Sequence, residues 1–292
     1  MKNFELGRFS LTRIVESNDP HLYAKNVFPD WNRELIKPHL DWMIPRHFLP
    51  NEEKLVIVIQ SFLIKTPHHT ILVDTCGGNH KERHGSFFHQ RQWNWIDKLA
   101  EAGAAPQDID LVLCTHLHVD HVGWNTKLKS GKWIPTFPNA KYIFSRREYN
   151  HWKALATETG LPRTGNYFSD SILPIVEAEQ ALMVDASYAP EDGVWLESFP
   201  GHTPDALGMH LKSNGDEAIL CGDLMHHKLQ CHIPDWSTNF CTDQNLARKT
   251  RSDFLKRYAD TDTLIFPAHF PEPTGGHIES TSDGFTFRFI GE

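Results

Sequence analysis

The sequence predicts a mixed α/β domain, and three observations favour this fold class. Short apolar runs bounded by turn residues recur from position 55 onward, as strands require. Amphipathic segments with helical spacing lie between some of those runs. The composition, 40% hydrophobic and 23% charged over 292 residues, is that of a globular chain able to bury a large core. Because no repeat or linker-like tract divides the chain, we expect a single domain over residues 1–292.

The elements can be placed in order along the chain. Residues 1–50 mix aromatic, proline and charged residues without a clear period, which predicts a strand or two with loops, an N-terminal extension near the functional site. Strands are then expected in the apolar runs "LVIVIQSFLIKT", "TILVDTC", "IDLVLCTH", "KYIFS", "VWLESFPG", "LGMHLKS", "EAILCGD" and "TLIFPAH". Two helices are expected: "QRQWNWIDKLAEAG", with Trp93, Ile96, Leu99 and Ala100 on one face, and "NLARKTRSDFLKRYAD", with Leu246, Thr250, Phe254 and Tyr258 on one face.

Charge and cysteine content exclude several classes of protein. Lys and Arg number 29 against 37 Asp and Glu, and the net charge of -8 would repel a phosphate backbone, so nucleic acid is not an expected partner. The chain has no apolar run of membrane-spanning length and no apolar core typical of a signal peptide at its start, so we expect neither membrane insertion nor secretion. Five cysteines without C-x-x-C spacing argue against a disulfide framework and favour a cytoplasmic location.

The stretch "THLHVDHVGWN" places three histidines and an aspartate within six positions, directly after a predicted strand. Even with 19 histidines in the chain, H-x-H-x-D-H is expected by chance only about 0.005 times per sequence, so the motif is specific. His116 and His118 alternate along an extended segment and can point the same way, whereas Asp120 and His121 lie where the chain turns. One short segment can therefore serve two metal ions.

Three further ligand-type residues, His202, Asp223 and His269, each follow a predicted strand. A single histidine or aspartate at such a place is more often a turn residue, but several of them at strand ends can converge from distant parts of the sequence. Together with the motif they give five imidazoles and two carboxylates without a thiolate. This set suits Zn²⁺ and also tolerates Fe, Mn or Co.

The motifs "HLHVDH", "GHT", "GD" and "AH", preceded by "ILVDTCGGN", occur in an order that resembles the metallo-β-lactamase superfamily over roughly residues 55–275. The resemblance implies an αββα four-layer sandwich of two mixed β-sheets with helices on the outer faces. It also implies two divalent metal ions, one held by His116, His118 and His202, the other by Asp120, His121 and His269, with Asp223 bridging both. By the same resemblance, Asp74 is expected to orient a ligand histidine.

A pair of divalent cations about 3.5 to 4 Å apart can hold a shared water as a bridging hydroxide and polarise the bond under attack. We therefore expect a metal-dependent hydrolase, in which Asp120 also passes a proton to the leaving group. Zinc β-lactamases typically carry a cysteine where this chain has Asp223, which disfavours an antibiotic substrate. The stretches "CGDLMHHKLQ" and "PAHFPEPTGGHI" are most similar to the branch of methyl parathion hydrolase-like enzymes and quorum-quenching lactonases.

That similarity implies a small carboxylic ester as substrate, above all a lactone such as an acyl-homoserine lactone, with aryl esters and organophosphate triesters as alternatives. His226 stands where the better-known lactonases carry a substrate-contacting tyrosine, and its imidazole N–H could donate to the developing oxyanion. An apolar substrate pocket is expected, and its aromatic candidates are Phe88, Trp124, Trp152 and Phe168, with Phe48 a weaker one.

Two alternatives of other classes stay open. One is a mononuclear iron dioxygenase acting on sulfur compounds, although the full two-metal ligand set argues against it. The other is a non-catalytic scaffold that keeps a structural metal. In either case, 9 Trp and 18 Phe leave apolar surface to cover, which favours a homodimer as the assembly.

Overall fold

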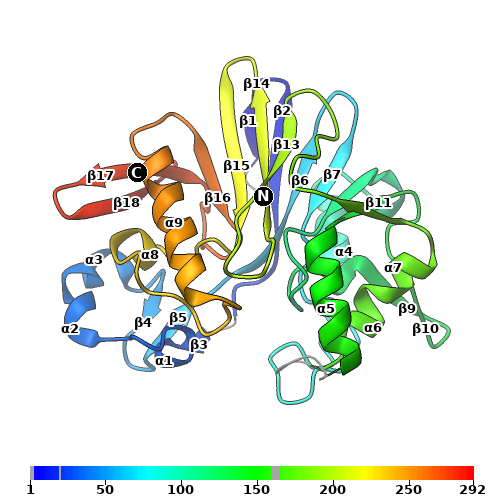
Figure 1. The fold of residues 1–292 in the computed structure, drawn as a ribbon, viewed down its shortest axis with the longest axis horizontal. Coiled ribbons are helices and arrows are strands. Elements are labelled where there is room, and N and C mark those ends of the chain that lie inside the picture. The colour runs from blue at the N-terminus through cyan, green and yellow to red at the C-terminus, as the bar shows by residue number, and fades with distance from the viewer. Residues whose placement is uncertain (1–2, 20, 159–164) are drawn as a thin grey trace.

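The computed structural model describes residues 3–19, 21–158 and 165–292. Two β-sheets lie face to face at the centre, and helices cover the outer face of each sheet (Figure 1). This is the four-layer αββα sandwich with two mixed sheets that the resemblance of the sequence motifs implies. Within the described ranges, no helix combines the length and the apolar character needed to cross a lipid bilayer.

The first sheet contains seven strands in the described part of the chain, antiparallel from β1 to β7 and parallel from β7 to β12. In spatial order these strands are β1 (Asn3–Leu6), β2 (Phe9–Ser17), β6 (Ile59–Lys65), β7 (Thr70–Val73), β8 (Leu111–Leu113), β11 (Lys141–Ser145) and β12 (Ala181–Val184). Parallel neighbours need long crossovers, and helices occupy those between β7 and β8 and between β11 and β12.

The second sheet contains six strands among the described residues, and only the β15–β16 pair is parallel. In spatial order they are β13 (Val194–Ser198), β14 (Leu207–Ser213), β15 (Asp216–Gly222), β16 (Leu264–Pro267), β17 (Gly276–Thr281) and β18 (Gly284–Phe289). Smaller sheets pair β9 (Thr126–Lys129) with β10 (Lys132–Pro135), and β5 (Lys54–Val56) with both β3 (His21–Tyr23) and β4 (Phe48–Leu49).

The helices gather on the two outer faces of the sandwich and around the N-terminal segment (Figure 1). The α-helices are α1 (Ala24–Val27), α2 (Arg33–Ile36), α3 (Leu40–Met43), α4 (Trp95–Glu101), α5 (Arg146–Glu158), α6 (Tyr167–Ser171), α7 (Leu173–Glu177), α8 (Leu229–His232) and α9 (Gln244–Tyr258). Short 3₁₀ turns are η1 (Lys37–His39), η2 (Pro106–Asp108) and η3 (Gly123–Asn125).

Separate apolar cores hold the four layers together. The core between the sheets includes Phe62 and Leu220, one from each sheet. A second core packs Trp95 of α4 against the outer face of the first sheet, and a third packs Phe254 of α9 against the outer face of the second. Because both faces of the sheets are covered, a strand such as β6 is buried along almost its whole length, which explains the near-continuous apolar runs in the sequence.

All eight apolar runs predicted as strands form strands, but both predicted helices differ in detail. Helix α4 begins at Trp95, so Trp93 lies before it rather than on its buried face. In α9 the predicted face is partly wrong, because Leu246 is exposed whereas Arg251 is buried. The Arg251 guanidinium donates to the backbone carbonyl of Pro234 at 2.7 Å, and an apolar period cannot reveal a buried cation of this kind.

The N-terminal region is richer than the predicted strand or two with loops. Its first two strands extend the first sheet, and the following segment forms three short helices and part of a small sheet. Phe48 is fully buried in the core of that segment, with its ring 5.4 Å from that of Trp31. These surroundings are those of a core residue, and substrate contact at Phe48 stays a prediction.

Backbone contact at Gly123, directly after the histidine motif, gives a first prediction. An added Cβ would lie 2.0 Å from the carbonyl carbon and oxygen of Gly77, so Gly123→Ala must push two loops apart. We expect a loss of about 3 kcal/mol in the free energy of unfolding, measured by urea denaturation. As a control, Gly131→Ala meets no atom within 4 Å and carries only the strain of φ +77, which costs about 1 kcal/mol. Equal losses in the two variants would contradict the steric explanation.

Candidate metal centre

The side chains predicted as metal ligands meet where loops from both sheets come together. The loop after β8 carries His116, His118, Asp120 and His121. His202 follows β13, Asp223 follows β15 and His269 follows β16. The structure brings all seven side chains into groups whose candidate ligand atoms lie within 4.8 Å of one another.

The first group, here named the three-histidine group, consists of His116, His118 and His202. The Nε2 atom of His116, the Nδ1 atom of His118 and the Nε2 atom of His202 are separated pairwise by 3.0, 3.0 and 3.1 Å. Neutral imidazoles carry one N–H each, so three ring nitrogens that face a common point cannot all be paired with one another. Tetrahedral zinc would place such nitrogens roughly 3.3 Å apart, close to this triangle.

The second group, here named the aspartate group, consists of Asp120, His121 and His269. The Oδ2 atom of Asp120 lies 3.8 Å from Nε2 of His121 and 3.7 Å from Nε2 of His269. In the described part of the chain, Nε2 of His121 is buried and has no hydrogen-bond partner. A buried nitrogen without a partner is costly unless a further group binds it, so this arrangement fits a cation.

Asp223 lies between the two groups. Its Oδ1 atom is 3.0 Å from Nε2 of His269 and 3.4 Å from Nε2 of His121, both in the aspartate group. Its Oδ2 atom is 3.2 Å from Nε2 of His202 and 3.7 Å from Nε2 of His116, both in the three-histidine group, and it also lies 3.1 Å from Nε2 of His269. One carboxylate thus faces both groups, which is the geometry that a bridging ligand requires.

The ionisation of the two groups differs. Burial lowers the pKa of His118 to about 4 and the pKa of His116 and His202 well below the ordinary value, so these rings are neutral. In the aspartate group burial acts in the same direction and is the largest single cause, but the nearby carboxylates, Asp223 first, together outweigh it and raise the pKa of His121 and His269. Without a metal, protons on those two rings supply the positive charge that the carboxylates require. Metal binding there would release protons.

Asp74 follows β7 and contacts the aspartate group from behind. Its carboxylate accepts hydrogen bonds from the backbone N–H of Thr115 at 2.8 Å and from the Thr115 hydroxyl at 2.9 Å. It also accepts from Nδ1 of His121 at 2.8 Å, which leaves Nε2 of that ring facing Asp223. These contacts are those of a residue that fixes the orientation and tautomer of a ligand histidine.

His226 also reaches the centre. Its Nε2 atom is 3.2 Å from Oδ2 of Asp223, and its ring centroid is 4.7 Å from that of His202. Burial lowers its pKa, so the ring is neutral at neutral pH. Because His202, Asp223 and His226 form a further group at ligand spacing, the geometry is compatible with a substrate contact and also with a metal ligand.

Of the four aromatic residues predicted to line a substrate pocket, Trp152 directly contacts the three-histidine group. Its ring lies edge-on to that of His118, with 5.0 Å between centroids. The others pack against different neighbours: Phe168 against Tyr149, Trp124 against Trp95, and Phe88 against Gly77. For all four, substrate contact stays a prediction.

Glu16 on β2 is a buried carboxylate that the sequence analysis missed. It accepts hydrogen bonds from the indole N–H of Trp124 at 2.7 Å and from the backbone N–H groups of Gly77 and Gly78 at 2.9 and 3.1 Å. It thereby joins the loop after β7 to the end of the histidine motif. No sequence signal marks it, because residues 1–50 show no clear period.

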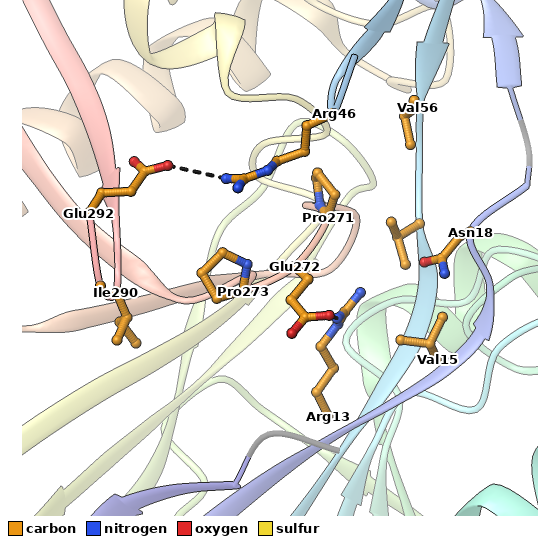
Figure 2. Close-up of a pocket in the computed structure, with 12 residues that line it drawn as sticks. Arg13, Val15, Asn18, Arg46, Val56, Pro271, Glu272, Pro273, Ile290 and Glu292 are labelled. Carbon is orange, nitrogen blue, oxygen red and sulfur yellow. Dashed lines mark hydrogen bonds and ion pairs between the residues drawn. The ribbon is translucent and has the colours of Figure 1, made fainter. Parts of the chain in front are cut away.

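A surface pocket of about 670 Å³ is lined by other residues (Figure 2). Two ion pairs line it, Arg46 with Glu292 at 3.1 Å and Arg13 with Glu272 at 3.8 Å. None of the seven predicted ligands lines this pocket. The convergent histidines and aspartates, and not this pocket, are therefore the candidate functional site.

Comparison with known proteins identifies the family. Residues 56–269 match the family model of the metallo-beta-lactamase superfamily, a span that contains all seven predicted ligands. The chain belongs to the metallo-beta-lactamase superfamily. The expectation from the sequence motifs is thus confirmed.

Curated relatives of this metallo-beta-lactamase superfamily chain include N-acyl homoserine lactonases of Bacillus. The enzyme of Bacillus thuringiensis is 26% identical over 125 residues, which is 43% of this chain and 42% of that protein. A lactonase of Bacillus sp. is 26% identical over 180 residues, 58% of this chain and 64% of that protein. The chain thus matches less than two thirds of the length of either lactonase.

Solved structures agree with the fold over nearly the whole chain. AidC, a dizinc quorum-quenching lactonase in complex with a product, has a TM-score of 0.79 and 24% identity, and covers 100% of this chain and 97% of its own. The hydrolase AbOPH has a TM-score of 0.81 and 22% identity, and covers 99% of this chain and 96% of its own. At these identities the two structures support the sandwich architecture.

The contacts of Asp74 predict a specific effect on metal binding. Asp74→Asn keeps the shape of the side chain but loses acceptor capacity toward Thr115 and His121, so the aspartate group should bind Zn²⁺ about 10- to 100-fold more weakly. Titration against a chromophoric chelator measures this affinity. Asp110→Asn is the matched control, because Asp110 accepts from Thr70 N–H at 2.8 Å in an exposed setting. Wild-type affinity in Asp74→Asn would exclude the orienting role.

Burial raises the pKa of Glu16 from 4.5 to about 7, with the charge of Asp120 as a smaller cause in the same direction. Between these pH values the folded protein keeps a proton that the unfolded chain has released. This contribution to stability is therefore full below pH 4.5 and is lost as the pH rises to about 7.

Glu16→Gln removes this titration. In metal-free protein, the free energy of unfolding of the wild type relative to the variant should fall by about 3 kcal/mol across that window. Urea denaturation at several pH values gives the difference. A difference that stays constant with pH would show that Glu16 does not titrate there.

Proposed function

We propose that this protein is a dinuclear metal-dependent hydrolase that cleaves a small carboxylic ester, with a lactone such as an acyl-homoserine lactone as its substrate. The observation that carries the proposal is the position of Asp223, whose carboxylate lies within 3.2 Å of a histidine nitrogen in each of two ligand groups. A purely structural zinc site is a single closed set of four ligands. Two adjoining sets that share one carboxylate leave coordination positions for water and substrate.

Zn²⁺ is the expected ion, with Mn, Fe or Co as alternatives, and a bound pair would supply a nucleophile at neutral pH and polarise the ester carbonyl. The three-histidine group and the aspartate group would each hold one ion. Asp223 would fix the distance between the ions. Asp74 keeps the His121 ring turned toward this shared carboxylate.

Asp120 and His226 are proposed to act on the substrate. The Asp120 carboxylate is partly exposed and can accept a proton from the attacking water and pass it to the leaving alkoxide oxygen, a contribution on the order of 10² to 10⁴ in rate. His226 is neutral and buried, so its imidazole N–H can donate to the carbonyl oxygen as negative charge develops there. Asp120 lies 3.8 Å from Nε2 of His121, and His226 lies 3.2 Å from Oδ2 of Asp223.

Two kinds of observation support a lactone as the substrate. The curated relatives are N-acyl homoserine lactonases, and AidC is a lactonase of the same fold. The Trp152 ring beside His118 adds an apolar surface of the kind that an acyl chain requires. The two-group arrangement also argues against a mononuclear iron dioxygenase, which would need a single set of ligands.

The proposal is tested with metal-free protein reconstituted with Zn²⁺ or Mn²⁺. We expect two metal equivalents per chain and hydrolysis of N-hexanoyl-homoserine lactone that a chelator abolishes and metal restores. Asp223→Asn should lower turnover on the order of 100-fold, because the shared carboxylate is lost. Glu217→Gln on β15, the strand that precedes Asp223, is the control, since Glu217 pairs with Lys212 at the surface, and it should retain full activity.

The substrates tested in parallel separate the alternatives. Faster turnover of aryl esters or phosphotriesters than of lactones would replace the lactone while retaining the hydrolase. A single bound iron with oxygen consumption would favour the dioxygenase. Two bound metals without turnover of any of the three substrate classes would contradict the hydrolase itself.

A further inference from the structure

A buried carboxylate on α5, Glu148, connects the two loops that carry the three-histidine group. Its Oε1 atom accepts a hydrogen bond from the backbone N–H of Asp205 at 2.8 Å, three residues after His202. Its Oε2 atom accepts from the backbone N–H of Leu117 at 3.4 Å, between His116 and His118. The residue is only 1% exposed, so water cannot replace these donors.

This connection matters because the two loops come from different sheets. The loop after β8 belongs to the first sheet and the loop after β13 to the second. A backbone hydrogen bond from the N–H of Leu207, where the second loop ends, to the carbonyl of Thr115 joins them at 2.7 Å. Glu148 adds a second connection, beside the histidines themselves. Each carboxylate oxygen accepts a hydrogen bond from one of the two loops, so the distance between the two oxygens sets the spacing of the loops.

Glu148 also fixes an aromatic ring against the group. Its Oε2 atom accepts from the indole N–H of Trp152 at 2.7 Å, one turn further along α5. The Trp152 ring lies edge-on to His118 at 5.0 Å and limits the rotation of that imidazole. One carboxylate therefore restrains both loops and one ligand ring.

Burial raises the pKa of Glu148, and its hydrogen bonds oppose that shift. Glu148 is in the first turn of α5, where the helix dipole favours negative charge, and it receives three N–H donors. Asp205, whose N–H it holds, is in turn fixed by the hydroxyl groups of Ser145 and Ser198, both at 2.5 Å. The support behind the three-histidine group is thus a connected network.

We infer that Glu148 is a positioning residue that sets the spacing and orientation of His116, His118 and His202, and thereby the affinity of this group for a divalent cation. The inference rests on the proposed function, because it takes the three histidines as metal ligands. It is specific to one group. The aspartate group has supports of its own, Asp74 behind His121 and the Val58 carbonyl behind His269, the latter at 2.8 Å.

The test measures metal affinity without turnover. Glu148→Gln replaces one oxygen by an amide NH₂ that cannot accept from an N–H, so one loop is released. Co²⁺ is titrated against a chelator of known affinity, and the imidazole signals that cobalt shifts identify the group filled at each step. We expect about 10- to 100-fold weaker binding at the three-histidine group and unchanged binding at the aspartate group.

Two further variants control the result. Glu148→Asp keeps the charge but is one methylene shorter, so it cannot reach both loops and should weaken the same group. Asp170→Asn removes another buried carboxylate, which Arg83 binds at 2.6 and 2.7 Å, and should lower stability while both metal affinities stay unchanged.

The outcomes separate this inference from the proposed function. Wild-type protein that binds two cations, with both Glu148 variants binding equally well, would overturn the role of Glu148 and leave the hydrolase intact. A fall at both groups that Asp170→Asn reproduces would show general destabilisation and also overturn the role. Wild-type protein that binds no cation would remove the proposed function and this inference together.

Discussion

Asp223 is a buried carboxylate, and its negative charge is stable at that depth only with positive charge beside it. The arrangement of the site follows from this constraint. Among the described residues, five imidazoles approach it within 3.7 Å, those of His116, His121, His202, His226 and His269. Burial opposes its charge, yet the neighbouring rings, His269 first, hold its pKa well below the ordinary value. An anion kept ionised at this depth requires cations beside it, whether protons or metal ions.

The αββα sandwich serves this requirement by delivering loops from two sheets to one place. Each sheet is covered on both faces, so the ends of β8, β13, β15 and β16 are held by packing on either side. Behind the ligands, two carboxylates divide the support: Asp74 holds His121, and Glu148 holds the backbone beside His118 and His202. Stiff apolar layers and a few buried acceptors together position a polar centre.

The strands and the ligand residues could be predicted from the sequence because their signals are local. Eight apolar runs between turn residues are visible in the sequence, and the histidine motif from His116 to His121 spans only six residues. Glu16, Glu148 and Arg251 could not be predicted, because each is polar and becomes buried through partners far away in the chain. A buried polar residue interrupts the apolar period instead of following it. For the same reason, the prediction of the buried face of α9 was partly wrong.

The close approach of Gly123 to Gly77 has a consequence for how this centre can change over time. The two loops touch backbone to backbone, and Gly123 N–H donates to the Cys76 carbonyl at 2.7 Å, so no side chain separates them. The segment that carries Asp120 and His121 and the segment that carries Asp74 are therefore expected to move together as one rigid unit. Other loops around the site can change in sequence independently of one another, but a substitution in one of these two segments requires a compensating change in the other.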